Sequence, residues 1–161
     1  MRIETLYRYP VKGLSAESLE DVTVEPGEPF PHDRRFALVQ GDAPFDAAAP
    51  RFLPKQNFAC LMANAVVATV RSAFDERRNA LALAAPDRAP LCAATDTDDG
   101  RAAIAGFLSA VLGDEARGTP RFLDAPGHAF ADQKRKCVSL INMASLHAFE
   151  AAIGRRLDPL R

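Results

Sequence analysis

The chain has 161 residues, of which 48% are hydrophobic and 25% are charged, and its formal net charge is -1. That length fits one domain, or one domain and part of another, and the composition is typical of a globular protein. A nearly neutral chain has no global attraction for nucleic acid or for an anionic membrane, and no apolar stretch approaches the ~18 residues of a transmembrane helix. Charges within the first 20 residues argue against a usual signal peptide, and the three cysteines form no CxxC pair, so we expect a cytoplasmic protein.

The first predicted strand covers residues 2–9 and leads into Pro10-Val11-Lys12-Gly13. Pro10 ends the hydrogen-bond ladder, and Gly13 allows either a turn or the close approach of a ligand. A lysine beside such a glycine at a strand end is suited to gripping a phosphate. The alternative is an exposed lysine in an ordinary turn. Lys12 and Gly13 are therefore candidate anion-binding residues.

Short elements follow. β-branched and apolar runs between turn residues predict strands at residues 18–25, 33–40, 65–74, 80–84, 91–95 and 121–123. Residues 42–54 indicate a loop, and residues 55–62 fit a strand or a short helical turn. Apolar residues at helical spacing predict a helix from about residue 101 to residue 112, closed by Gly113.

The predicted strand at residues 33–40 begins with Asp33-Arg34-Arg35. Neighbouring side chains on a strand point to opposite faces, so one arginine can face solvent while the other lies under an adjoining surface, where Asp33 can orient it. Together with Lys12, this pattern suggests an oxyanion or phosphate pocket. The alternative is a surface strand with a salt bridge that contributes little.

The C-terminal part predicts a buried strand at residues 137–141 and then a helix at residues 143–153. Asn142 fits the N-cap of this helix and Gly154 its end. A helix N-terminus also offers free N–H groups to anions. Core packing is the expected role of Cys92 and Cys137. His128 and Asp132 fit either an acid/base pair or a hydrogen bond within a loop.

Many short strands with two helices indicate an α+β fold with a mostly antiparallel, curved or barrel-like sheet. In their order, several motifs resemble the MOSC family, the molybdenum cofactor sulfurase C-terminal type. The matching motifs are Tyr9-Pro10-Val11-Lys12-Gly13, Asp33 to Val39, Phe52-Leu53-Pro54-Lys55, His128 to Asp132, Val138 to Leu146, and Leu157 to Arg161. This resemblance divides the chain into an N-terminal MOSC β-barrel-like region at 1–96, a helix and connector at 97–126, and the start of a MOSC domain at 127–161.

The resemblance implies a molybdopterin cofactor and, in the whole protein, molybdenum-dependent oxidoreductase or sulfur-transfer chemistry. It assigns Lys12, Gly13 and Arg34 to the cofactor's phosphate and pterin, and places Ser139 and Asn142 along the cofactor. Pyridoxal phosphate binding is a further expectation at the level of the family. An electron-transfer or sulfur-donor protein is the implied partner, and a homodimer is a further expectation.

This sequence departs from the family pattern, because the metal-ligating cysteine of the family lies downstream of Arg161. We therefore expect neither a metal ligand nor a catalytic residue in this chain. The alternatives are a non-catalytic module that binds an anionic small molecule or a protein partner, and a purely structural barrel in which Lys12 and Arg34 make surface ion pairs.

Overall fold

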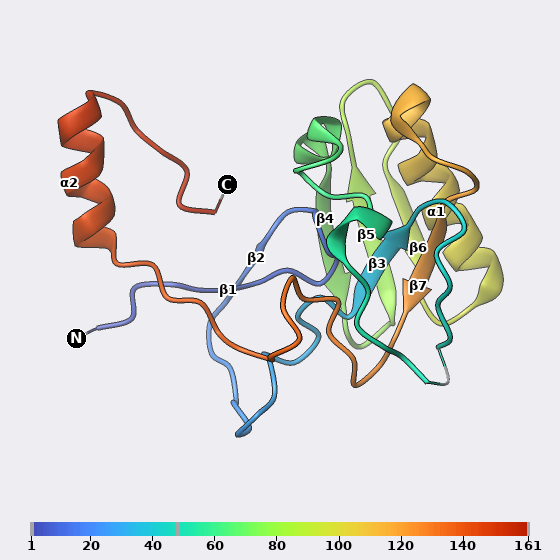
Figure 1. Cartoon of the computed structure of the whole chain (residues 1–161), viewed down its shortest axis with the longest axis horizontal. Coiled ribbons are helices and arrows are strands. Elements are labelled where there is room, and N and C mark those ends of the chain that lie inside the picture. Colours follow the sequence, from blue (N-terminus) through green and yellow to red (C-terminus); the bar gives the residue numbers. More distant parts are fainter. Residues whose placement is uncertain (1, 48, 161) are drawn as a thin grey trace.

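The computed structural model describes residues 2–47 and 49–160, which form three antiparallel sheets and two α-helices (Figure 1). The strands are β1 (Leu6–Arg8), β2 (Glu17–Leu19), β3 (Phe36–Val39), β4 (Arg71–Asp75), β5 (Ala80–Ala84), β6 (Leu91–Ala94) and β7 (Arg121–Asp124). β1 pairs with β2, β3 pairs with β7, and β5 lies between β4 and β6. The strands are short, and the predicted α+β class is confirmed. The sheets of the described residues do not close into a barrel.

The helices are α1 (Asp98–Leu112) and α2 (Met143–Ile153), and 3-10 turns occur at η1 (Lys55–Asn57), η2 (Ala65–Thr69) and η3 (Gly113–Glu115). Thr97 begins α1 by accepting a hydrogen bond from the Gly100 amide at 3.2 Å. Because of this cap, the helix starts at Asp98 and not near residue 101. The predicted end at Leu112 is confirmed.

β3 is buried along its whole length and separates two clusters of apolar side chains. Phe36 and Leu38 belong to the larger cluster, and Ala37 and Val39 belong to the smaller one. This division follows from the alternation of side chains along a strand. A strand that is apolar on both faces therefore becomes the centre of the core.

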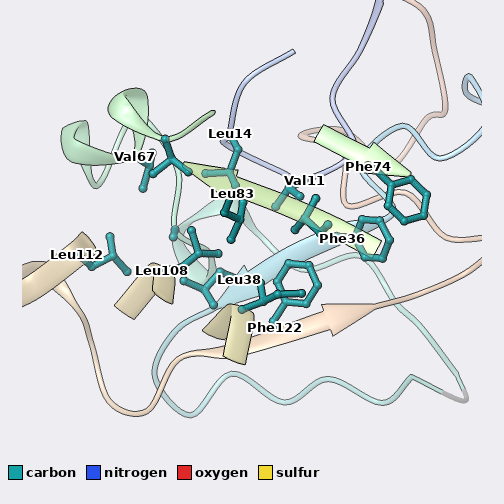
Figure 2. Packing of buried hydrophobic residues seen from close by; sticks show 14 residues of the cluster. Val11, Leu14, Phe36, Leu38, Val67, Phe74, Leu83, Leu108, Leu112 and Phe122 are labelled. Atoms are coloured by element: carbon teal, nitrogen blue, oxygen red, sulfur yellow. The ribbon is translucent and has the colours of Figure 1, made fainter. Parts of the chain in front are cut away.

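The larger cluster joins β3 to one face of α1 (Figure 2). Ile104, Leu108 and Leu112 lie one turn apart on that face and are all buried. They pack in a cluster that also contains Val11 and Phe36. Residues on both sides of the predicted boundary at 96 therefore share this core, and the division into domains stays a prediction.

Five predicted strands are shorter than expected. β1 covers only Leu6–Arg8 of the predicted 2–9, β3 begins at Phe36 and not at residue 33, and β6 ends at Ala94. β2 ends at Leu19 and not at residue 25, because its partner β1 begins at Leu6 and the pair Leu6–Leu19 is the last of the register. The stretch predicted as a strand at 65–74 starts as the 3-10 turn η2, and its strand β4 begins at Arg71.

The predicted buried strand at 137–141 is wrong. These residues form no strand and pair with none among the described residues, and Leu140 is 80% exposed. The core packing expected for Cys92 and Cys137 is also wrong, because both are exposed, whereas Cys60 is buried. Apolar composition was not sufficient to bury a segment that has no partner strand.

α2 has the predicted bounds and caps. The Asn142 side chain accepts from the Ser145 amide at 3.2 Å, and Gly154 adopts the left-handed conformation at the C-terminus. Figure 1 shows α2 apart from α1 and the sheets, and Phe149 and Ile153 are exposed on it. None of the described helices combines the length and the apolar character needed to cross a membrane.

Candidate functional site

Lys12 follows β1, and hydrogen bonds between its backbone and β3 fix its position. Val11 forms a parallel bridge with Phe36, and the Lys12 amide donates to the Phe36 carbonyl at 2.8 Å. The Lys12 side chain is 5% exposed. Its Nζ donates to the carbonyl of Phe130 at 2.9 Å and to Asp132 Oδ1 at 2.5 Å. The Lys12 ammonium is therefore buried and paired, and not the exposed lysine of an ordinary turn.

An aromatic ring adds to this environment. Lys12 Nζ lies 5.5 Å from the centroid of the Phe58 ring. A cation near an aromatic face is attracted by the ring quadrupole, and the attraction grows when water is excluded. A buried ammonium needs such partners because taking an unpaired charge out of water is costly.

Gly13 allows the chain to pack closely at this point. Its φ is +82°, a conformation that favours glycine, and a Cβ added there would lie 2.8 Å from the Ala59 carbonyl oxygen. The close neighbour in the structure is thus the backbone at 59–60. The role of Gly13 in binding a cofactor stays a prediction.

Arg34 does not begin a strand as predicted but lies in the turn before β3, where its φ is +51°. Its amide donates to the Tyr9 carbonyl at 2.6 Å, and its guanidinium lies over the Tyr9 ring, 4.9 Å from the centroid. Asp33 forms an ion pair with this guanidinium, although the sequence led us to expect it beside the more buried of the two arginines. Arg35 instead pairs with Asp124, so Arg34 is the arginine that remains partly exposed.

The carboxylate of Asp132 contacts Lys12 and is influenced by the charges of two further cations. The hydrogen bond from Lys12 holds the pKa of Asp132 below its usual range, against the opposing effect of burial. The charges of Lys12, Lys55 and Arg34 lower this pKa further. We call Lys12, Arg34 and Lys55 the cation cluster. It combines three positive charges with the carboxylates of Asp33 and Asp132.

Sequence reasoning found Lys12 and Arg34 but missed Lys55 and the pairing of Asp132 with Lys12. Lys55 begins η1 directly after Pro54, and its place in the motif Phe52-Leu53-Pro54-Lys55 is the sequence signal that points to it. Asp132 is 120 residues from Lys12, so no spacing rule brings the two together.

The structure does not bring Ser139 and Asn142 to the cation cluster. Both are exposed, and the Asn142 side chain caps α2, which lies apart from the sheets (Figure 1). Their role in binding a cofactor stays a prediction.

His128 and Asp132 contact different partners. The His128 ring packs against Phe45 and Phe130, with ring centroids 6.3 and 5.0 Å away. Burial lowers the pKa of His128, and the charge of Lys136 acts in the same direction. Asp132 is bonded to Lys12. This arrangement favours a structural role for each residue over an acid/base pair.

A second group of charged residues surrounds His32. Arg8 Nε lies 2.8 Å from Glu17 Oε1, and Arg8 also pairs with Glu76. His32 Nε2 lies 3.6 Å from Glu76 Oε2, while Arg35 contacts His32 Nδ1 at 3.4 Å. Burial lowers the pKa of His32. These pairs connect β1, β2 and the turn after β4.

A cavity of about 920 Å³ lies between the loop at 41–53 and residues 119–121. Lys12, Arg34, Lys55 and Asp132 are not among its lining residues, so the cavity and the cation cluster are separate features. Among residues 2–47 and 49–160, no three His, Cys, Asp or Glu side chains are grouped so that they could hold a metal ion.

A family model described as the MOSC N-terminal beta barrel domain matches residues 1–115. The chain belongs to this family. No curated protein and no solved structure matches the chain. In this MOSC N-terminal beta barrel protein, the cation cluster lies within the matched residues, whereas Asp132, Ser139 and Asn142 lie beyond them.

Proposed function

We propose that this protein binds the phosphate-bearing end of a small anionic cofactor at the cation cluster, and that the cofactor is the molybdenum cofactor. The observation that carries the proposal is the buried ammonium of Lys12, held against a carboxylate that Lys55 and Arg34 also attract. The family adds support, since MOSC proteins are generally associated with this cofactor.

The residues of the cluster fit a phosphate. Lys12 supplies a compact positive charge, and Arg34 supplies a planar guanidinium that matches two phosphate oxygens. Lys55 adds a third charge from η1. In this proposal Lys12 holds the anion, Arg34 orients it, and Lys55 strengthens the local positive potential.

When bound, the molybdenum cofactor supplies oxygen-atom or sulfur chemistry at its metal. The described residues suit its anionic end, and we assign none of them to the metal. Ser139 and Asn142 enter the proposal through the family resemblance, and they reach the cluster only if the stretch before α2 moves.

The wider setting belongs to the same proposal. We place the protein in the cytoplasm, with an electron-transfer or sulfur-donor protein as its partner. Exposed apolar side chains near the C-terminus, at Val138, Leu140, Ile141, Phe149 and Ile153, offer a contact for a homodimer.

The second candidate function is a non-catalytic module for an anionic small molecule. It is favoured by the same cluster, because lysine and arginine bind a phosphate without any metal. The two candidates differ in the ligand that the purified protein retains, which is a pterin in the first case and another anion in the second.

The first experiment measures whether inorganic phosphate raises the Tm, with sodium chloride at equal ionic strength as the reference. A ligand that binds the folded state stabilises it by about 1.4 kcal/mol at ten times its Kd. We expect this rise in the wild type and a much smaller one in Lys12→Met and Arg34→Ala. Arg78→Ala is the matched control, since Arg78 is exposed and outside the cluster. Equal rises in all four proteins contradict the anion site.

The second experiment measures the pterin content of the same purified proteins by fluorescence after oxidation. We expect less pterin per protein in Arg34→Ala than in the wild type and Arg78→Ala. A phosphate response without any pterin supports the non-catalytic module. Equal pterin content in Arg34→Ala and the wild type excludes Arg34 as a cofactor contact.

A further inference from the structure

Asp132 lies on the solvent side of the buried Lys12. Its side chain is 66% exposed, whereas that of Lys12 is 5% exposed, and Lys12 Nζ lies 2.5 Å from Asp132 Oδ1. The other bond of this ammonium goes inward, to the Phe130 carbonyl at 2.9 Å. An anion that approaches Lys12 from this side therefore competes with the Asp132 carboxylate.

Asp132 is negatively charged, as is the phosphate that we propose for the cation cluster. Lys12, Lys55 and Arg34 all favour its ionised form. A single carboxylate thus receives the attraction of three cations that come from three separate segments of the chain. A phosphate in the same place would carry more negative charge and more acceptor oxygens.

The chain before Asp132 is bonded to the core, whereas the chain after it is exposed. Phe130 is buried, and its amide donates to the Arg34 carbonyl at 2.8 Å. The cover segment, which we define as residues 131–142, leads from there to α2 and is almost entirely exposed. Besides the Lys12 bond, its ion pair is Lys136 with Glu28, and both of these side chains are partly exposed. Exposed pairs of this kind hold a segment weakly.

We propose that Asp132 occupies the anion position of the cation cluster in the unliganded protein, and that an anionic ligand displaces it and releases the cover segment. This inference rests on the proposed function. It makes Asp132 a competitor of the ligand and not a ligand contact. The apparent affinity for an anion is then reduced by the fraction of molecules in which Asp132 covers Lys12.

Calorimetric titration with inorganic phosphate tests the competition. If Asp132 covers Lys12 about nine-tenths of the time, Asp132→Asn binds phosphate about tenfold more tightly than the wild type. Asp132→Ala should behave in the same way. Asp114→Asn is the matched control, because it removes one exposed carboxylate outside the cluster and should bind phosphate like the wild type.

Limited trypsin digestion provides the second readout. The cover segment contains three exposed cleavage sites, Lys134, Arg135 and Lys136. We expect phosphate to speed cleavage there in the wild type, and Asp132→Asn to be cleaved quickly without phosphate. Cleavage at Arg77 and Arg78, in the exposed turn after β4, serves as the internal reference.

The outcomes distinguish the anion site itself from the displacement of Asp132 by the anion. If phosphate binds neither the wild type nor Asp132→Asn, the anion site is wrong and the displacement falls with it. If phosphate binds both proteins equally and cleavage of the cover segment does not change, the anion site stands and the displacement is overturned. Weaker binding by Asp132→Asn overturns it as well, because Asp132 would then assist the ligand.

Discussion

Tyr9 and Arg34 are joined by a 2.6 Å backbone hydrogen bond and by the stacking of the Arg34 guanidinium over the Tyr9 ring. Asp33 reinforces this link from both sides. Its Oδ1 accepts from the Tyr9 amide at 2.8 Å, and its Oδ2 pairs with Arg34. The position of the Arg34 guanidinium therefore depends on the carboxylate of Asp33.

Asp33→Ala should remove this support. Asp33 is buried, and its loss removes the bonds from the Tyr9 amide and from Arg34, so we expect the free energy of unfolding to fall by about 1–3 kcal/mol. Phosphate affinity should fall as well, because Arg34 loses its orientation. Urea unfolding and calorimetric titration measure the two effects. Asp21→Ala, at an exposed site, should stay within about 0.5 kcal/mol of the wild type.

Gly13→Ala should be strongly destabilising, through backbone strain and through a clash of the new Cβ. Gly27→Ala separates these two causes, because it adds the strain alone. Both glycines have nearly the same φ, +82° and +83°, but a Cβ at Gly13 meets the Ala59 carbonyl oxygen at 2.8 Å and one at Gly27 meets nothing within 4 Å. We expect Gly27→Ala to cost about 1 kcal/mol of stability from the backbone strain. Gly13→Ala should cost clearly more. Equal midpoints in urea would show that the chain can move away at residue 59.

Arg35 and Asp124 should be coupled energetically. They form two parallel hydrogen bonds of 2.6 and 2.7 Å, and their side chains are 13% and 9% exposed. A double-mutant cycle of Arg35→Ala and Asp124→Ala should give a coupling energy of at least about 1 kcal/mol. The same cycle on the more exposed pair of Lys136 and Glu28 should give less than about 0.5 kcal/mol. Similar coupling energies for the two pairs would contradict the expectation that the more buried pair is the more strongly coupled.

Stability should fall as the pH drops from 7 to 5.5, partly because of His32. Burial lowers the pKa of His32 in the folded state, so the unfolded chain binds more protons in this range and stability rises with pH. The loss begins near the unfolded pKa of about 6.5 and continues as the pH falls towards the folded value. His32→Gln should flatten the dependence of the urea midpoint on pH.

Local signals predicted local structure well. Caps and apolar spacing placed α2 at its observed bounds and the end of α1 at Leu112, and an apolar run between turn residues placed β5 at residues 80–84. These features depend on neighbours within a few residues, which a sequence displays directly. The Lys12–Asp132 contact spans 120 residues and had no such signal.

The strand errors at 19–25 and 137–141 share one physical cause, which is that a strand needs a partner. Residues 137–141 have the composition of a buried strand but pair with no strand in the described parts of the chain. The predicted strand after Leu19 ends because β1 begins at Leu6 and provides no further register. Composition predicts a preference for the extended backbone, whereas pairing is decided by the rest of the molecule.

The pairing of β3 with β7 has a consequence for synthesis. β3 is synthesised long before its partner β7 at residues 121–124. Until then, the hydrogen-bonding groups on that edge of an apolar strand are unpaired. Contacts between such distant residues form slowly, and an unpaired edge invites association with other chains in the meantime. The residues that match the family, 1–115, end before β7. An expression product cut at that boundary would keep β3 without its neighbour and would be prone to aggregate.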